Sequence, residues 1–213
     1  MPWTAIILWA ATWFGTPTEG SPWVGPPDVI EACEARLQAA EVRFSSAQIE
    51  VHWNRGHAFQ CGTPQAVRYI SGPAKIRWQR SPKTSCALAL ALAKFEVVVR
   101  EEALRHLKTS VVAVRHAGTY NCREMAAYPG WVSEHSYANA IDISGFRLHN
   151  RQELTVGRDY NLPGPRGAFL RAVARRAFDE GIFSVVLTPA FDGLHRHHLH
   201  VDLARYRVDG TGR

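Results

Sequence analysis

Two stretches with alternating apolar and polar residues most constrain the fold of this chain. Residues 140–144 read AIDIS and residues 198–203 read HLHVDL, so branched apolar side chains recur at every second position in both. Such alternation is typical of a half-buried β-strand, whose side chains point in turn to the two faces of a sheet. Both stretches therefore predict strands that bury their aliphatic side chains and turn their polar side chains to the opposite face.

The polar side chains of these strands are of metal-ligating types. Asp142 lies on the first strand with His135 seven residues before it, and His200 lies on the second strand beside His198. A lone histidine on a strand is more often a surface or core residue than a ligand, but four such groups on two strands favour a metal site. Catalytic zinc uses three protein ligands and keeps a fourth position open. We therefore predict zinc bound by His135, Asp142 and His200, with a further histidine free to transfer protons.

The motifs around these residues resemble a known family. The segments GTYNCRE (118–124), SEHSYANAIDISGF (133–146) and HRHHLHVD (195–202) are similar to the extensin-like C-terminal domain family of bacteria, and the resemblance runs from about Cys33 to Tyr206. The pattern S-x-H-x(6)-D followed by H-x-H also resembles zinc peptidases of the D-Ala-D-Ala metallopeptidase and hedgehog fold. The resemblance implies an α+β domain in which a small antiparallel sheet, packed with helices, carries the zinc site.

The resemblance also implies roles for individual residues. His135, Asp142 and His200 match the zinc ligands, and His198 matches the catalytic histidine. His195 matches a further active-site histidine of some relatives, and we expect it to assist in the transition state. The chain has no HExxH motif and so no glutamate base of the zincin type. His198 is therefore expected to be the base that activates the attacking water.

Two positions depart from the family pattern. Ala138 stands where relatives often have glycine, and His197 stands where the pattern usually has aspartate. If residue 138 needs a positive φ, alanine there costs on the order of 1 kcal/mol. Alternation along the second strand places His197 on the face opposite His198, so replacing it is expected to be nearly silent.

Three further residues are expected to contact substrate. A strand is predicted at 110–115, followed by a turn at 116–123. In the resembled families a Tyr/Arg turn at this place lines the substrate cleft, which implies substrate-binding roles for Tyr120, Arg123 and Ser133. The guanidinium of Arg123 could bind a peptide carboxylate or a tetrahedral oxyanion, which would also make it catalytic. An ordinary surface salt bridge is the alternative for Arg123.

These features predict a zinc-dependent peptidase that hydrolyses amide bonds in peptidoglycan cross-link peptides. Two alternatives remain: a non-catalytic module that binds cell wall and keeps the zinc site, and a zinc-dependent hydrolase of another substrate. The net charge of +6 and pI near 9.4 favour anionic partners, namely a cell-wall polymer, a membrane surface or nucleic acid. Basic residues are scattered and no nucleic-acid-binding motif is present, which argues against nucleic acid.

The cysteines predict an oxidising compartment. Their even number and the absence of a CxxC pair favour two disulfides over a cysteine zinc cluster, with four free thiols in a cytosolic protein as the alternative. We expect the pairs Cys33–Cys61 and Cys86–Cys122, because each would tie the N-terminal half of a helix to a neighbouring loop.

The N-terminal region predicts export. Residues 3–14 form an apolar run too short to span a bilayer comfortably, which resembles a secretion signal without the preceding basic residues. Residues 1–14 are therefore interpreted as a signal or a membrane anchor, 15–27 as a Pro/Gly linker, 28–208 as the domain and 209–213 as a tail. The protein is expected in the periplasm, outside the cell or attached to the membrane through its N-terminal segment.

The remaining patterns predict the scaffold. Helices are expected from residue 28, from Ser85 to 107 and over 165–180, with a strand over 183–187. Residues 43–70 read as short strands and loops interrupted at 61–62, and residues 146–162 as a hairpin or loop.

Overall fold

The computed structural model of the chain describes residues 27–56 and 59–212. The segment interpreted as a signal or anchor, and the linker up to residue 26, lie outside the described residues. Among the helices that are described, none has both the length and the apolar character needed to cross a bilayer.

The described residues form α-helices, two 3-10 helices and short strands. The helices are α1 (Pro27–Ala39), α2 (Cys86–Leu107), α3 (Val156–Asp159) and α4 (Pro165–Asp179), with η1 (Glu134–Tyr137) and η2 (Gly193–His195). The strands are β1 (Arg43–Ser46), β2 (Ile49–Asn54), β3 (Phe59–Thr63), β4 (Ala66–Ser71), β5 (Arg77–Trp78), β6 (Lys83–Ser85), β7 (Val111–Gly118), β8 (Ala140–Leu148), β9 (Glu153–Thr155), β10 (Val185–Leu187), β11 (Leu199–Asp202) and β12 (Val208–Gly210). The predicted helices are all present within a residue or two of their expected bounds.

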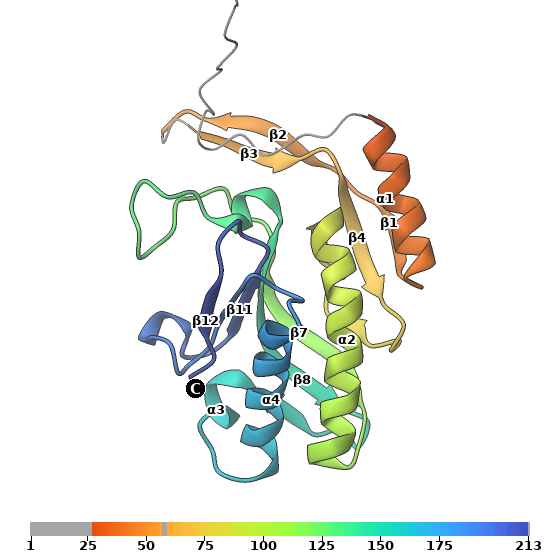
Figure 1. Cartoon of the computed structure of the whole chain (residues 1–213), viewed down its shortest axis with the longest axis vertical. Coiled ribbons are helices and arrows are strands. Elements are labelled where there is room, and N and C mark those ends of the chain that lie inside the picture. Colours follow the sequence, from red (N-terminus) through yellow and green to blue (C-terminus); the bar gives the residue numbers. More distant parts are fainter. Residues whose placement is uncertain (1–26, 57–58, 213) are drawn as a thin grey trace, which may run out of the picture.

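The main sheet has seven strands in the order β12-β10-β11-β8-β7-β5, with β9 paired to β8 (Figure 1). The β5–β7 and β10–β12 pairs are parallel, whereas the other pairs are antiparallel. The α+β class is confirmed, but the sheet is mixed and larger than the small antiparallel sheet predicted. Because β5 and β12 span only two and three residues, an alternation pattern cannot reveal them in the sequence.

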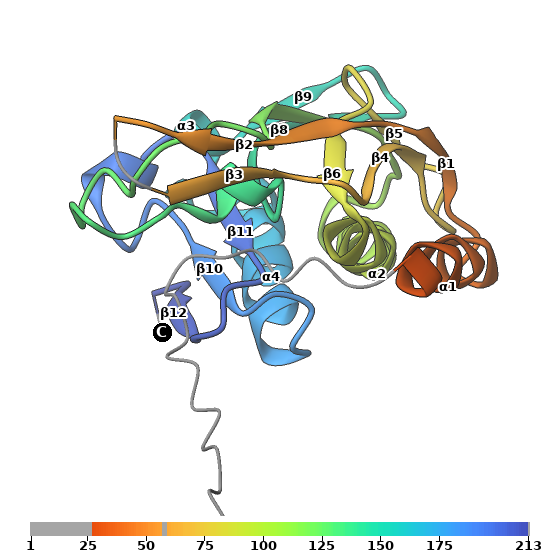
Figure 2. The same cartoon turned by 90° about the horizontal axis from the view of Figure 1, so that it is seen from above.

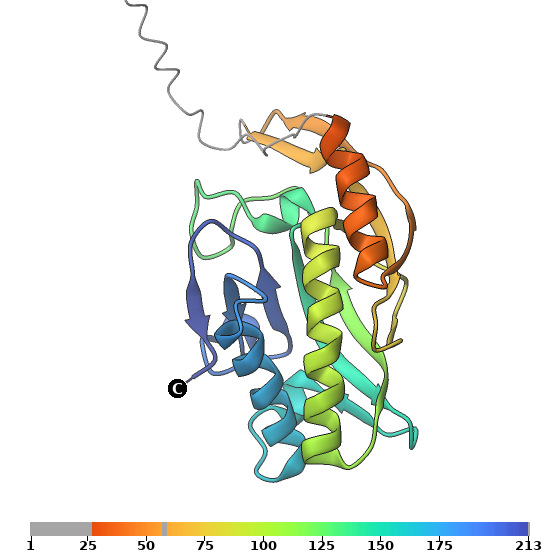
Figure 3. The same cartoon turned by 45° about the vertical axis from the view of Figure 1, so that its right-hand side comes forward.

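Helices α2 and α4 lie side by side against one face of this sheet (Figure 3). Ser85 caps α2 as predicted, since its Oγ accepts a hydrogen bond of 3.1 Å from the backbone N–H of Leu88. The core between helices and sheet includes Phe95 of α2, whose ring meets that of Phe183 edge to face at 5.7 Å. Burial of this face leaves the opposite face of β8 and β11 for polar side chains.

Two disulfides are present, but their pairing differs from the prediction. Cys33 pairs with Cys86 and Cys61 pairs with Cys122, with Cα–Cα distances of 6.3 and 5.7 Å. The reason is the placement of two elements: α1 packs beside the start of α2, and the β2–β3 hairpin reaches over the segment that follows β7 (Figure 2). Neither placement is encoded locally around the cysteines.

Three boundaries also differ from those expected. Cys61 and Gly62 lie inside β3 and do not interrupt it. Gly62 has φ +94°, and a Cβ there would come within 2.0 Å of the Glu50 carbonyl oxygen, so only glycine allows this close approach. Strand β7 continues to Gly118, so the predicted turn at 116–123 begins later. Strand β12 pairs with β10, and residues 209–212 are therefore part of the domain and not a tail.

Candidate metal centre

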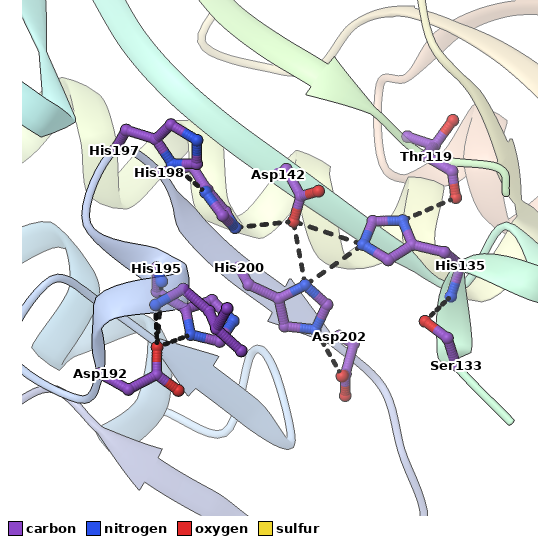
Figure 4. Close-up of polar contacts among 11 residues, drawn as sticks. Thr119, Ser133, His135, Asp142, Asp192, His195, His197, His198, His200 and Asp202 are labelled. Carbon is purple, nitrogen blue, oxygen red and sulfur yellow. Dashed lines mark hydrogen bonds and ion pairs between the residues drawn. The ribbon is translucent and has the colours of Figure 1, made fainter. Parts of the chain in front are cut away.

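Two adjacent strands and one short helix bring the predicted zinc ligands together (Figure 4). Strands β8 and β11 are antiparallel neighbours, and Asp142 stands directly opposite His200 in their register. Residues directly opposite on neighbouring strands project from the same face. Helix η1 precedes β8 and supplies His135, which is buried, whereas Asp142 and His200 are half-buried. Ile141 and Ile143 are fully buried on the other face, as the alternation predicts.

The three ligand atoms lie close to one another. The distance is 3.3 Å from His135 Nε2 to Asp142 Oδ1, 3.3 Å from His135 Nε2 to His200 Nδ1, and 3.0 Å from His200 Nδ1 to Asp142 Oδ1. A tetrahedral zinc ion with ligands at about 2.0–2.1 Å separates its ligand atoms by about 3.3 Å. The spacing therefore fits one zinc ion bound by these three side chains.

The second nitrogen of each histidine faces an acceptor. His135 Nδ1 lies 3.2 Å from the backbone carbonyl oxygen of Thr119, and His200 Nε2 lies 2.9 Å from Oδ2 of Asp202. In the tautomers in which each of these nitrogens carries the proton and donates it outward, the lone pairs of the other two nitrogens converge with a carboxylate oxygen on one point. Such an arrangement requires a shared proton or a cation at that point, and outer hydrogen bonds of this kind are typical of metal-bound histidines.

The same contacts shift the pKa values of two ligands. Burial alone would raise the pKa of Asp142, but hydrogen bonds from His135 and His200 hold it well below its usual value. Burial alone would lower the pKa of His200, but its hydrogen bonds to Asp142 and Asp202 raise it to about 9. The electrostatics of the site therefore favour positive charge between the two carboxylates.

His198 lies at the edge of this cluster. Its Nε2 is 3.5 Å from Asp142 Oδ1, and burial lowers the pKa of His198 to about 4. Its Nδ1 is 2.9 Å from Nδ1 of His197, so the expectation that His197 faces away from His198 is wrong. The strand begins only at Leu199, and the preceding residues form a turn in which the His198 N–H bonds to the His195 carbonyl at 3.3 Å.

His195 is held by an aspartate that the sequence reasoning missed. Asp192 Oδ1 lies 2.6 Å from His195 Nδ1 and also accepts hydrogen bonds from the backbone N–H groups of Leu194 and His195. The His195 ring centre is 5.2 Å from that of His198 and 5.8 Å from that of His200. Burial lowers the pKa of His195 even though Asp192 opposes this shift. The spacing D-x-x-H in 192–195 is the signal that could have indicated this pair.

Comparison with known proteins identifies the family. The family described as extensin-like protein C-terminus matches residues 31–211. The chain belongs to this family. Neither the curated proteins nor the solved structures contain a significant match.

The residues expected to bind substrate lie in different settings in this extensin-like domain. Ser133 is buried and caps η1, where its Oγ accepts from the His135 N–H at 3.4 Å, so it positions a predicted ligand. Arg123 donates from its guanidinium to the Glu124 carbonyl and forms no salt bridge with any described residue, contrary to the surface-salt-bridge alternative. Tyr120 is 36% exposed. The structure gives no contact that assigns a substrate role to any of these residues.

Ala138 has the backbone conformation that was considered from the sequence. Its φ is 52°, in the left-handed region, and it ends η1. The side chain is fully buried against Ile49 and Ala66. The methyl group thus packs in a small apolar cluster, which offsets part of the cost of a positive φ.

A second group of potential metal-binding atoms is not a metal site in the oxidised extensin-like domain. His52, Cys61 and Cys122 lie close together, but the two sulfur atoms form a disulfide. A cysteine ligates metal as a thiolate, so this group lacks the required donors.

Proposed function

We propose that this extensin-like domain is a zinc-dependent peptidase that hydrolyses amide bonds in peptidoglycan cross-link peptides. One observation carries the proposal: three potential ligand atoms, from His135, Asp142 and His200, lie within 3.0–3.3 Å of one another, and the outer nitrogen of each imidazole has an acceptor beside it. This donor set is the one used by catalytic zinc, which has three protein ligands and an open position.

The neighbouring histidines suit amide hydrolysis. Zinc, when bound, lowers the pKa of a water ligand and polarises a carbonyl group. His198 is neutral in the neutral pH range and can accept a proton from the attacking water through Nε2, provided that its Nδ1–H donates to His197. It then returns this proton to the leaving amine. His195, oriented by Asp192, presents its ring to the same space and can hydrogen-bond the reacting groups.

The proposed partner is peptidoglycan or another anionic cell-wall polymer. The net charge of +6 supports an anionic partner, and no nucleic-acid role is proposed. Two disulfides indicate an oxidising, exported environment. We place the protein in the periplasm, outside the cell or at the membrane, with the N-terminal segment as its attachment in the last case.

Turnover of purified peptidoglycan tests the proposal. The full chain should release peptide fragments, lose this activity with a chelator and regain it on addition of zinc. His200→Ala should lower the zinc content and abolish turnover, whereas the matched control His149→Ala, at an exposed position after β8, should do neither. Undiminished zinc in His200→Ala would remove His200 from the ligand set. Zinc and wall binding without any turnover would instead indicate the non-catalytic module.

A further inference from the structure

A large cavity lies beside the candidate metal centre and has no part in it. Its volume is about 1000 Å³, and its walls come from α1, the N-terminal half of α2, η1 and the loop between β11 and β12. In Figure 1 the N-terminal end of α2 lies between α1 and that loop. None of the three predicted ligands His135, Asp142 and His200 lines this cavity, but both sites share η1.

Two aromatic rings stand at the rim of the cavity. Trp131 is 61% exposed and Tyr206 is 39% exposed, and their rings lie nearly perpendicular, with centres 6.5 Å apart. Large aromatic side chains are costly to leave in water and mark binding surfaces when they gather beside a concave region. An exposed aromatic face of this kind packs well against the C–H face of a sugar ring.

Cationic side chains surround the same cavity. Arg36 of α1, Lys94 of α2 and Arg205 of the loop after β11 are exposed and come from three separate elements. None of the three has a carboxylate partner within 4 Å among the described residues. Glu134 is the one acidic side chain among the described residues of the wall, and its carboxylate already accepts a hydrogen bond of 2.7 Å from Asn139. The cavity is therefore complementary to a ligand with several negative charges.

We propose that this cavity binds a glycan that carries carboxylate groups, with sugar rings on Trp131 and Tyr206 and carboxylates beside Arg36, Lys94 and Arg205. The wall also presents the polar side chains of Thr63, Gln65 and Asn139, which suit sugar hydroxyl and amide groups better than a lipid chain. Among the described strands only two end residues line it, Thr63 of β3 and Ser85 of β6, so an acidic peptide would meet no run of strand edge long enough for strand addition.

The inference rests on the proposed function for the kind of polymer, because a glycan strand of the cell wall carries the peptides that the metal centre would cut. The arrangement around η1 links the two sites: Glu134 lines the cavity, and the next residue, His135, belongs to the metal centre. A strand held in the cavity through muramic acid units that carry no peptide, whose lactyl carboxylates are free, would keep the peptides of neighbouring units near the zinc ligands. Binding itself needs no turnover.

Calorimetric titration of the full chain tests the inference. The probes are peptide-free glycan chains of alternating N-acetylglucosamine and N-acetylmuramic acid, a neutral N-acetylglucosamine oligosaccharide of equal length, and an acidic peptide. The acidic glycan should bind most tightly and should lose affinity as salt rises. Trp131→Ala should weaken binding about tenfold or more, and Arg205→Gln should weaken it by about threefold or more. The matched controls are Trp53→Ala, at a tryptophan that is 58% exposed on β2, and Arg100→Gln, at an exposed arginine of α2; both should bind as the wild type does.

The outcomes separate this inference from the proposed function. Equal affinity for the neutral and acidic glycans, tightest binding of the acidic peptide, or unchanged binding by Trp131→Ala would overturn it. The His200→Ala protein should retain glycan binding, since His200 does not line the cavity. Glycan binding without cleavage of cross-linked peptides would refute the peptidase and leave the glycan site standing, while cleavage without glycan binding would do the reverse.

Discussion

Asp202 gives the sharpest test of the candidate metal centre, because it would act on a bound metal only through His200. Its Oδ2 lies 2.9 Å from His200 Nε2, and its Oδ1 accepts a hydrogen bond of 2.9 Å from the backbone N–H of Ala204. The side chain is 3% exposed, so water cannot replace a lost partner. Both carboxylate oxygens therefore act as acceptors, and each has a defined donor.

Asp202→Asn keeps the shape of the side chain but has only one acceptor atom. If the amide oxygen faces the Ala204 N–H, the amide NH₂ donates to His200 Nε2 and the imidazole proton moves to Nδ1. That proton then occupies the atom that would ligate zinc. If the amide oxygen faces His200, two N–H groups meet at Ala204. Loss of such an outer hydrogen bond typically weakens metal binding about 10- to 100-fold, or about 1.4–2.7 kcal/mol.

The assay is a zinc titration of the full chain against a chromophoric chelator at neutral pH, with circular dichroism to confirm folding. Asp159→Asn is the matched control: Asp159 is equally buried, but its partners are Arg158 and the Thr155 N–H and include none of the three predicted ligands. The control should keep the zinc affinity of the wild type. Wild-type affinity in Asp202→Asn would show that Asp202 does not set the His200 tautomer, and the assignment of Nδ1 as a ligand atom would fall.

Three further predictions concern proton transfer, backbone strain and pH. His198→Ala should keep zinc but lower turnover about 100-fold or more. His197→Ala should lower kcat several-fold, because His197 holds His198 Nδ1. Unchanged kcat in both variants would remove this pair from catalysis. Ala138→Gly should leave the free energy of unfolding, measured by chemical denaturation, within about 0.5 kcal/mol of the wild type. Glycine removes the conformational cost of a positive φ, but the loss of a buried methyl group costs about 0.8 kcal/mol of stability and offsets this gain. Burial opposes ionisation of Asp159, but hydrogen bonds from Arg158 and Thr155 lower its pKa. The ionised side chain therefore stabilises the fold above its unfolded pKa of about 3.9, and this stabilisation is lost as pH falls through the folded pKa. Asp159→Asn should flatten the dependence of unfolding free energy on pH below about 4.

The grouping of His135, Asp142 and His200 could be predicted from the sequence because two of these residues lie on locally encoded strands. The alternation in 140–144 and 199–202 places Asp142 and His200 on the polar faces of two strands, and those strands are neighbours in the sheet. The error at His197 has a local cause as well: alternation holds only within a strand, and the turn closed by His195 and His198 lies before the strand begins. A pattern read one residue too far therefore gave the wrong face.

The disulfide pairing could not be predicted, because it depends on tertiary placement. Cys61 meets Cys122 only because the β2–β3 hairpin crosses the segment after β7, 61 residues further along the chain. No local pattern near either cysteine encodes this approach. The short strands β5 and β12 escaped prediction for a related reason, since their pairing is decided by the neighbours they meet and not by their own residues.

The structure divides the three proposed ligands into two with fixed positions and one that depends on a loop. The sheet register holds Asp142 and His200 opposite each other, and directly opposed residues keep Cα separations of about 4.5–5.5 Å with or without metal. His135 instead depends on η1, which is held by the Ser133 cap at its start, the left-handed Ala138 at its end and the Thr119 carbonyl on the ring. Two ligands are thus pre-organised by the sheet, and the third is positioned by contacts that substitution can loosen. Changes at η1 should consequently alter zinc affinity while the sheet stays intact.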